Sequence, residues 1–465
     1  MTHLDAEHFD QNARAALQDA TLRQALRRAT DLFAERRARA IGAVEDWEAL
    51  REQARAIKAH TLARLDHYLT QFADQAERAG VKVHWAKDAA AACRIVAQIA
   101  ADHDCHRLVK AKSMATEEIG LNAALARADK EPIETDLGEW IIQLAGETPS
   151  HIIVPAIHKT RQAIGALFVD QLGIPPTTEP AVLADHARQR LRAHFAQADL
   201  GISGVNFGVA ETGTILILEN EGNARMTTTL PRVHIAVMGI EKVIPRFADL
   251  EVFLRLLPRS GTGQHLTTYQ SLLTGPSPQD GPRELHVVLL DNGRSRIVAD
   301  EAMRSTLACI RCGACLNACP VYQQIGGHAY GSVYPGPIGA ILSPQLDGHA
   351  GATTLPFASS LCGACKDVCP VKIDIPSLLL ELRHRAVLSP PPHQRRRPFL
   401  ERLGFRLWAF CHRGPRRQAL LMFLTRLLLR VPGVRRLGPA GAWTATRELP
   451  APPRLPFRRR PEARR

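Results

Sequence analysis

CIRCGACLNACP (309–320) and LCGACKDVCP (361–370) together contain seven of the ten cysteines in this 465-residue chain. The first stretch has three cysteines at every third position and a fourth that precedes proline, and the second stretch repeats the C-x2-C-x3-C-P ending. Three thiolates at this spacing wrap a loop around one cubane cluster, and the cysteine before proline ligates the other cluster in two-cluster ferredoxins. The two stretches therefore predict a pair of [4Fe–4S] clusters.

An exchange of the fourth cysteines assigns the ligands of each cluster. The last cysteine of the second stretch completes the first cluster, and the last cysteine of the first stretch joins the second cluster. The predicted ligands are Cys309, Cys312, Cys315 and Cys369 for cluster 1, and Cys319, Cys362 and Cys365 for cluster 2.

Cluster 2 lacks a fourth cysteine. When the two stretches are aligned on their C-P ends, Ser359 stands where the first stretch has Cys309. The alternatives for the fourth ligand are the Ser359 oxygen, a histidine such as His328 or His349, a residue of a partner, or solvent. A three-iron centre is a further alternative, and the sequence leaves all of them open.

Zinc is the alternative metal, because C-x2-C pairs also form tetrahedral zinc sites. Zinc sites use two separated pairs, however, and a run of three cysteines followed by C-P has no role in one. The start of the chain, MTHLDAEHFDQ, shows no secretory signal, and cysteines in such a chain are typical of metal ligands rather than disulfides. We therefore expect iron–sulfur clusters in a cytoplasmic protein.

Upstream of the cysteines, the pattern changes from helical to alternating. Residues 5–80 have apolar side chains three and four positions apart, which predicts helices. Beyond them, β-branched runs alternate with helical stretches such as 89–100 and 114–128, and this alternation predicts an α/β domain with a mainly parallel sheet. The strand candidates are VKVHW (81–85), RLVKAK (107–112), HIIVPAI (151–157), TILILE (214–219), HIAVMGI (234–240) and HVVLLD (286–291).

Changes in composition divide the chain into four parts. We expect an N-terminal helical region at 1–60, an α/β domain at 61–300, an α-helical ferredoxin-like domain at 301–388, and a Pro/Arg-rich linker with a basic helical tail at 389–465. The segment 320–361, between the two cysteine stretches, has no periodicity, and a loop of this length is usually functional or disordered. Its GGHAYG run, with His328 and Tyr330, is a candidate cover for one cluster.

The positive charge is concentrated in the tail. Residues 391–465 contain 19 Arg, no Lys and three acidic residues, a net charge of +16 within a total of +13. Such a polycation favours an acidic partner protein or an anionic membrane surface, with a solubilising extension as the alternative. Low aromatic content argues against binding of nucleic acid. No uninterrupted apolar run reaches the ~18 residues of a membrane span.

The chain resembles a known family over nearly its whole length. The run CIRCGACLNACPVYQQIGGHAYGSVYPGPIGA (309–340), followed by LCGACKDVCPVKIDIP (361–376), resembles the lactate utilization protein B family, the iron–sulfur subunit of a three-protein L-lactate-oxidising system. The run GISGVNFGVAETGTILILENEGNARMTTTLPRVHIAVMGIEKVIP (201–245) resembles a domain that two of that system's subunits share. The resemblance implies a fold related to the ribose-phosphate isomerase and CoA-transferase group, and partner subunits of a lactate-oxidising system.

Two hypotheses for the function follow. The first is an electron-transfer subunit that acts in oxidation of L-lactate to pyruvate only with its partners. The second is a stand-alone α/β ligand-binding protein or enzyme whose clusters are structural or redox-sensing. No G-x-G-x-x-G motif opens a strand–helix unit, so no resident flavin or nicotinamide site is expected.

Several polar residues of the α/β domain are weaker candidates. Glu211, in GVAETGT, is a potential nucleophile by analogy with CoA-transferase-like folds, but an acidic residue in a turn is the simpler interpretation. SGTGQH (260–265) is a candidate anion cradle or a flexible loop. Four more residues could bind a small carboxylate or act as loop caps and surface ion pairs: Asn206, Asn220, Asn223 and Arg225.

Overall fold

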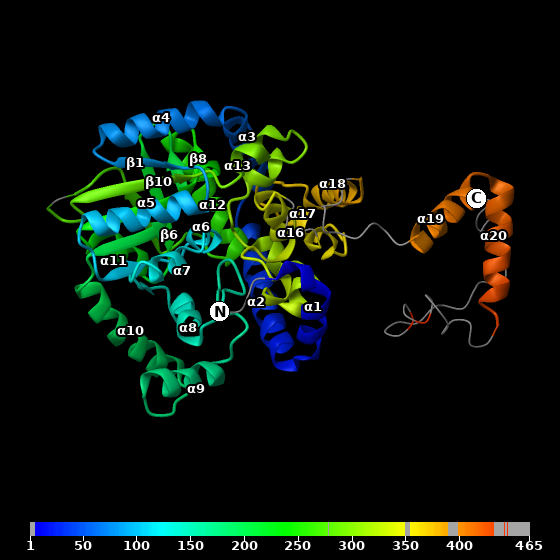
Figure 1. Cartoon of the computed structure of the whole chain (residues 1–465), viewed down its shortest axis with the longest axis horizontal. Helices are drawn as coiled ribbons and strands as arrows, with labels where there is room; N and C mark the ends of the chain where they lie inside the picture. Colours follow the sequence, from blue (N-terminus) through cyan, green and yellow to red (C-terminus); the bar gives the residue numbers. More distant parts are fainter. Residues whose placement is uncertain are drawn as a thin grey trace. The chain divides into compact units, whose positions relative to one another are not determined.

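The computed structural model describes residues 5–277, 279–348, 354–388 and 399–431, together with Gly441 and Thr444. The chain forms two compact units, Met1–Ser389 and Pro390–Arg465. The first unit contains both the α/β domain and the cysteine-rich region (Figure 1).

A six-stranded sheet forms the centre of the α/β domain (Figure 1). In spatial order its strands are β1 (Lys82–Ala86), β10 (Glu284–Leu290), β7 (Val233–Gly239), β4 (Leu200–Gly204), β2 (Leu108–Lys110) and β3 (Pro132–Glu134). Every neighbouring pair of strands runs parallel. The prediction of an α/β domain with a mainly parallel sheet is confirmed.

Helices cover both faces of this sheet. The helices of the α/β domain are α4 (Leu65–Arg78), α5 (Ala89–Asp102), α6 (Met114–Glu118), α7 (Leu121–Ala126), α8 (Leu137–Ala145), α9 (Arg161–Leu172), α10 (Pro180–Ala196), α11 (Asn223–Thr229), α12 (Leu250–Gly261) and α13 (Arg294–Ala299). On β7, Ile235 and Val237 share a core with α5 and α7, whereas Ala236 and Met238 share one with α4. Alternate side chains of a strand point to opposite faces. A strand buried on both faces therefore reads as a continuous apolar run.

A smaller sheet packs beside the first. Its strands, in spatial order, are β8 (Val243–Ile244), β5 (Phe207–Val209), β6 (Thr214–Glu219) and β9 (Tyr269–Leu273). β5 and β6 form an antiparallel hairpin, and β9 runs antiparallel to β6. The predicted strand TILILE is β6, so it exists but does not belong to the parallel sheet.

Three N-terminal helices precede α4 and share a core with the cysteine-rich region. They are α1 (Phe9–Gln18), α2 (Ala20–Gly42) and α3 (Trp47–Ala63). Asp19 and Asp46 cap the N-termini of α2 and α3, because their side chains accept backbone N–H groups of the first turn. Leu26 of α2 and Leu50 of α3 belong to the same buried cluster as the cysteines. The helices predicted in residues 5–80 are confirmed.

The cysteine-rich region is built from short helices. They are α14 (Ala314–Asn317), α15 (Tyr322–Ile325), α16 (Gly336–Leu346), α17 (Ala364–Asp367) and α18 (Ile375–Leu388). The expectation of a long aperiodic loop at 320–361 is wrong for the described part of that segment, because α15 and α16 lie within it. α16 contacts α14 and α18 and is buried over ten of its eleven residues. A helix buried all round shows no amphipathic period.

The predicted strand HIIVPAI (151–157) is also wrong, since this segment consists of bends and turns. Its backbone hydrogen bonds go to a side chain: the His151 Nδ1 accepts the N–H groups of Ile153 (3.0 Å) and Val154 (3.2 Å). The other ring nitrogen, Nε2, donates to the Asn317 Oδ1 at 3.1 Å. The apolar side chains are therefore buried against the cysteine-rich region rather than in a sheet.

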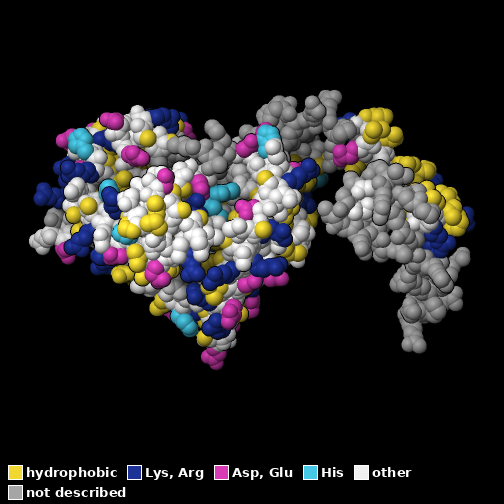
Figure 2. All heavy atoms as spheres, turned by 90° about the horizontal axis from the view of Figure 1, so that it is seen from below, with side chains coloured by type: hydrophobic (Ala, Val, Ile, Leu, Met, Phe, Trp, Pro, Cys, Tyr) yellow, Lys and Arg dark blue, Asp and Glu magenta, His cyan; other side chains and the backbone are white. Residues whose placement is uncertain are grey.

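The second unit contains two helices, α19 (Phe399–His412) and α20 (Pro415–Leu428). Figure 2 shows hydrophobic side chains together with Lys and Arg on this unit. Among its exposed apolar residues, Phe399, Trp408 and Phe423 each have more than half of their surface accessible. No helix in the described part of the chain is long and apolar enough to cross a membrane.

Candidate iron–sulfur and ligand site

Four of the predicted cluster ligands meet at one place. Cys309, Cys312, Cys315 and Cys369 line one small cavity beneath the start of α16 and α18. Three of these residues are buried, and Cys309 is half-buried. Each of Cys312, Cys315 and Cys369 lies close enough to Cys309 for their charges to interact. The loop before α14 and the turn after α17 thus bring together residues far apart in the sequence.

The other three cysteines form a second group. Cys319 is an electrostatic neighbour of Cys362, and Cys365 is an electrostatic neighbour of both. Cys362 is exposed, whereas Cys319 and Cys365 are buried. This group therefore has one side open to solvent.

The backbone of the two cysteine loops repeats at the position of the missing ligand. Arg311 has a φ of +61°, and its N–H donates to the Cys309 Sγ at 3.4 Å. Leu361 has a φ of +55°, and its N–H donates to the Ser359 Oγ at 3.1 Å. The Ser359 oxygen therefore has the same local setting in the second loop as the Cys309 sulfur has in the first.

Of the two histidines considered as the fourth ligand of cluster 2, only His328 lies within the described residues. The His328 Nε2 is hydrogen-bonded to the Thr148 carbonyl oxygen at 2.6 Å, and its ring lies against His158. His349 lies outside the described residues. Tyr330, by contrast, is fully buried, and its hydroxyl lies beside the Cys319 thiol. The GGHAYG run thus places a tyrosine, rather than its histidine, beside the second group.

The chemistry of the cysteine groups fits iron–sulfur clusters. Burial raises the pKa of Cys365 to about 12 and that of Cys369 to about 11, so these thiols stay protonated at neutral pH unless a metal ion supplies positive charge. Lys58, Lys242 and Arg311 lie within electrostatic reach of Cys309. Buried sulfur donors with cations around them suit a cluster whose net charge is negative.

Arg51 of α3 supports the turn that carries Cys369. Its Nε and Nη2 groups donate to the Cys369 carbonyl oxygen at 3.1 and 2.7 Å, and Nη2 also donates to the Asp367 carbonyl oxygen at 2.9 Å. The Lys372 amine, three residues after Cys369, lies 3.3 and 3.2 Å from carboxylate oxygens of Glu48 and Glu52 on the same helix as Arg51. The N-terminal region therefore forms part of the environment of the first cysteine group.

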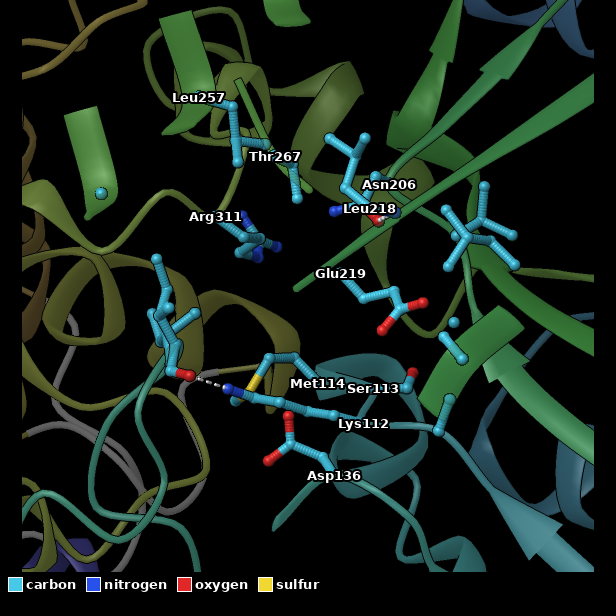
Figure 3. A pocket seen from close by; sticks show the side chains of 18 of the residues that line it. Lys112, Ser113, Met114, Asp136, Asn206, Leu218, Glu219, Leu257, Thr267 and Arg311 are labelled. Atoms are coloured by element: carbon cyan, nitrogen blue, oxygen red, sulfur yellow. Dashed lines mark hydrogen bonds between the residues drawn. The ribbon is translucent and has the colours of Figure 1, made fainter. Parts of the chain in front are cut away.

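A cavity of about 400 Å³ lies between the α/β domain and the cysteine-rich region. Its walls include residues that follow four neighbouring parallel strands: Lys112 after β2, Asp136 after β3, Asn206 after β4 and Lys242 after β7. The carboxyl ends of parallel strands are the usual ligand-binding edge of an open α/β sheet. Figure 3 shows Lys112, Asp136, Glu219 and Arg311 around the same open space.

Two glycines allow the walls of this cavity to approach closely. A Cβ atom on Gly204, at the end of β4, would lie 2.5 Å from the Ser113 Oγ. A Cβ atom on Gly261, at the end of α12, would lie 2.7 Å from the Cys312 carbonyl oxygen. The second contact brings the cavity wall against the loop of the first cysteine group.

The cysteine-rich region contributes Arg311 and Tyr334 to the cavity. The Arg311 guanidinium lies 5.0 Å from the centroid of the Tyr334 ring, and its Nη2 lies 3.2 Å from the Glu241 Oε1. The Glu241 Oε2 in turn accepts a hydrogen bond from the Arg294 Nε at 2.6 Å. Despite burial, these cations hold the pKa of Glu241 at about 2, so the carboxylate stays ionised.

Comparison with known proteins agrees with this two-part architecture. Residues 69–290 match the LUD domain, and residues 305–373 match the 4Fe-4S dicluster domain. "Lactate utilization protein B" of Macrococcus caseolyticus is 43% identical over 97% of this chain and 96% of its own length. The chain belongs to the lactate utilization protein B family. The dicluster match also identifies the cysteine-rich region as a [4Fe–4S] domain.

Other relatives of this lactate utilization protein B family member have related names. "Lactate utilization protein B 1" of Bacillus mycoides is 42% identical over 97% of this chain and 94% of its own length. "Uncharacterized electron transport protein YkgF" of Escherichia coli is 45% identical over 82% of this chain and 80% of its own. A crystal structure of a DUF162 family protein from Deinococcus radiodurans aligns with a TM-score of 0.29 and 15% identity, over 49% of this chain and 98% of that one.

The weaker candidates of the α/β domain separate into two groups in this family member. Glu211 lies in the β5–β6 turn, where its carboxylate accepts the Phe247 N–H at 2.8 Å and lies outside the cavity, as expected of a turn residue. The Arg225 side chain does not line the cavity either. The remaining candidates do line it: Asn206, Asn220, Asn223, and Gly261, Thr262 and Gln264 of the SGTGQH run.

The sequence did not single out the cations of the cavity. Lys112, Lys242 and Arg311 are far apart in the chain, and only the strand order and the packing of the cysteine-rich region bring them together. Their positions in the sequence could have indicated the site. Lys112 and Lys242 follow apolar runs that form strands, and Arg311 lies inside the first cysteine stretch.

Proposed function

We propose that this chain is an iron–sulfur electron-transfer subunit of a complex that oxidises L-lactate to pyruvate, and that it relays electrons through two [4Fe–4S] clusters. Oxidation of lactate to pyruvate releases two electrons and two protons, and a [4Fe–4S] cluster usually carries one electron at a time. Two clusters therefore suit the stoichiometry of the reaction. The observation that carries the proposal is the grouping of the seven cysteines into two sets within a [4Fe–4S] dicluster domain.

We assign Cys309, Cys312, Cys315 and Cys369 to cluster 1, and Cys319, Cys362 and Cys365 to cluster 2. The shared cavity of the first four residues and the electrostatic contacts of the other three support this crossed arrangement. Replacing Cys312 or Cys369 with Ser should remove the EPR signal of cluster 1, although the two residues are distant in the sequence. Replacing Cys319 should affect the signal of cluster 2. The crossed assignment would be contradicted if Cys312→Ser and Cys319→Ser both lost the same EPR signal and Cys369→Ser kept that signal.

We propose the Ser359 oxygen as the fourth ligand of cluster 2. The support is the repeated backbone of the two loops, in which the Ser359 Oγ and the Cys309 Sγ each accept the N–H of the residue two positions on. A hard oxygen ligand stabilises ferric iron more than thiolate does, which lowers the reduction potential of cluster 2 and makes it easier to oxidise. Mild oxidation should therefore convert cluster 2 to a three-iron form before cluster 1 changes.

The remaining parts of the chain have proposed roles in assembly. The parallel sheet and the resemblance of residues 201–245 support a fold related to the ribose-phosphate isomerase and CoA-transferase group. Beyond the cysteine-rich region, at 389–465, we propose a basic region that docks to a partner subunit or an anionic membrane surface. Its charge of +16 over residues 391–465 and the exposed apolar side chains of α19 and α20 support such contacts.

The second candidate function is a stand-alone α/β ligand-binding protein or enzyme with structural or redox-sensing clusters. The cavity at the carboxyl edge of the sheet is the observation that favours it. Anaerobic purification with iron and sulfide counts and EPR, followed by a lactate-to-dye assay, separates the two functions. A relay subunit should be inactive with lactate alone and active when its partner subunits are added, whereas full activity without partners would favour the second function.

A further inference from the structure

The cavity between the two domains lies at a switch point of the parallel sheet. From β2 the chain continues to β3 on one side, and from β4 it continues to β7 and then β10 on the other side. Connections that leave two neighbouring strands in opposite directions open a crevice at their carboxyl ends, and ligands of α/β proteins bind there. Ser113, after β2, and Asn206, after β4, both line this crevice.

Lys242 supplies a positive charge to this cavity without an ion-pair or hydrogen-bond partner of its own. Among the residues that the structure describes, no carboxylate lies within ion-pair distance of the Lys242 amine and no group accepts a hydrogen bond from it. The half-buried lysine is flanked by Arg311, which is close enough for the two cations to repel each other. Two adjacent cations in a recess, of which one lacks a partner, favour an anionic ligand.

Two glutamates that line the cavity accept hydrogen bonds from backbone N–H groups. The Glu219 Oε2 accepts the Gly222 N–H at 2.5 Å, and the Glu221 Oε2 accepts the Leu137 N–H at 3.1 Å. Glu221 and Asp136 act electrostatically on Lys112, whose amine donates to the Ile153 carbonyl oxygen at 2.5 Å (Figure 3). One part of the cavity is thus acidic around Lys112, and the part next to Arg311 is basic.

The basic part adjoins the loop assigned to cluster 1. The Arg311 N–H donates to the Cys309 Sγ, and the Arg311 Nη1 donates to the Cys309 carbonyl oxygen at 3.4 Å. Gly261, which also lines the cavity, packs against Cys312, and its carbonyl oxygen accepts a hydrogen bond from the Asn317 Nδ2 at 3.3 Å. A ligand held by Lys242 and Arg311 would therefore be separated from cluster 1 by a single layer of protein.

Uncharged polar groups provide further contacts. The Asn206 Oδ1 accepts the Leu218 N–H at 2.9 Å, and its Nδ2 has no acceptor among the described residues, which leaves it as a donor at the cavity wall. The volume of about 400 Å³ is within the range of small-molecule sites. The Asn206 donor can therefore orient a small polar ligand whose negative charge is neutralised by Lys242 and Arg311.

We propose that this cavity binds a small 2-hydroxy or 2-oxo carboxylic acid, with its carboxylate on Lys242 and Arg311 and its hydroxyl or keto oxygen toward the Asn206 Nδ2 donor. The inference rests on the proposed function in lactate oxidation and deepens it, because it places the binding site for the acid on this chain and next to cluster 1.

The test uses the full chain with its clusters loaded, kept anaerobic. Pyruvate is titrated by calorimetry into the wild type, the Lys242→Met variant and the matched control Lys82→Met. Lys82 lies at the start of β1, where its exposed amine pairs with Glu284. Loss of one charge-assisted contact should weaken pyruvate binding about tenfold or more in Lys242→Met, and Lys82→Met should bind as the wild type does. Acetone, which has the keto group without the carboxylate, should not bind.

A measurement on the wild type complements the variants in case Lys242→Met fails to fold. Pyruvate should alter the EPR spectrum of reduced cluster 1 and leave that of cluster 2 unchanged. The inference is overturned if pyruvate does not bind the wild type, if the two Lys→Met variants bind it equally, or if only cluster 2 responds. Absence of pyruvate binding together with reduction of the clusters by lactate and partner subunits would refute this inference alone. Binding of pyruvate to a chain whose clusters stay oxidised with lactate and partners would refute the proposed function.

Discussion

Replacement of Arg51 with Met tests how the N-terminal helices stabilise the environment assigned to cluster 1. The Arg51 side chain is only 9% exposed, and its guanidinium donates to two carbonyl oxygens of the turn that carries Cys369. Methionine retains a similar apolar stem and helix propensity but has no donors. The variant therefore leaves the carbonyl oxygens of Asp367 and Cys369 without these partners.

The size of the effect follows from these contacts. A hydrogen bond from a charged donor contributes about 1.5–3 kcal/mol, and an acceptor left buried without a partner costs about 1–3 kcal/mol. Since the contacts share one side chain and are not additive, we expect Arg51→Met to lower the free energy of unfolding by about 3–5 kcal/mol. Cluster 1 should also be lost faster than in the wild type, because the loosened turn carries Cys369.

Two assays measure these effects. Urea unfolding of the anaerobic, cluster-loaded chain gives the change in stability, and EPR during incubation with an iron chelator gives the rate at which each cluster is lost relative to the wild type. The matched control is Arg55→Met, one turn further along α3. Arg55 is half exposed and pairs with the exposed Glu52, so its loss should cost no more than about 1 kcal/mol.

Equal unfolding free energies for Arg51→Met and Arg55→Met would show that the guanidinium contacts do not stabilise the turn. Faster loss of cluster 2 in Arg51→Met than in the wild type, with the rate for cluster 1 unchanged, would contradict the assignment of Cys369 to cluster 1. Either result would refute the reasoning that links α3 to the first cysteine group.

Three further predictions concern other parts of the chain. Ser359→Cys should make cluster 2 more resistant to conversion to a three-iron form in air, as followed by EPR; an unchanged rate would exclude Ser359 as a ligand. Burial lowers the pKa of His234 to about 3, so the unfolded chain binds this proton first as the pH falls below about 6.5, and His234 alone should remove about 2 kcal/mol of the stability present at neutral pH when the pH reaches 5. His234→Gln can still hydrogen-bond Ser203, and its free energy of unfolding in urea should decrease less between pH 7 and pH 5 than that of the wild type. An equal decrease in the two proteins would show that His234 does not cause this pH dependence. Deletion of residues 391–465 should leave both clusters intact. It should also weaken co-sedimentation with anionic vesicles or partner subunits, which in the intact chain should decrease as salt is added. Unchanged association after the deletion would indicate that the tail is only a solubilising extension.

Much of the secondary structure was predictable from local patterns. The helices before residue 80 and the strands β1, β2, β7 and β10 follow from apolar periodicity and β-branched composition, because these elements bury their side chains in a regular repeat. The segment 151–157 has the composition of a strand, yet His151 accepts its backbone N–H groups. The segment 320–361 contains α16, which is buried all round and so has no period to detect.

The sequence by itself indicated a [4Fe–4S] domain, which the dicluster match supports, because cluster binding depends on cysteine spacing within short loops and this spacing is local. It also indicated the α/β class and the isolated charge of the tail. Only the tertiary structure decided that Ser359 has the same backbone setting as Cys309. It alone brought Lys112, Lys242 and Arg311 to one cavity. The physical reason is that strand order and domain packing are set by the summed burial of many side chains, which no single spacing along the chain encodes.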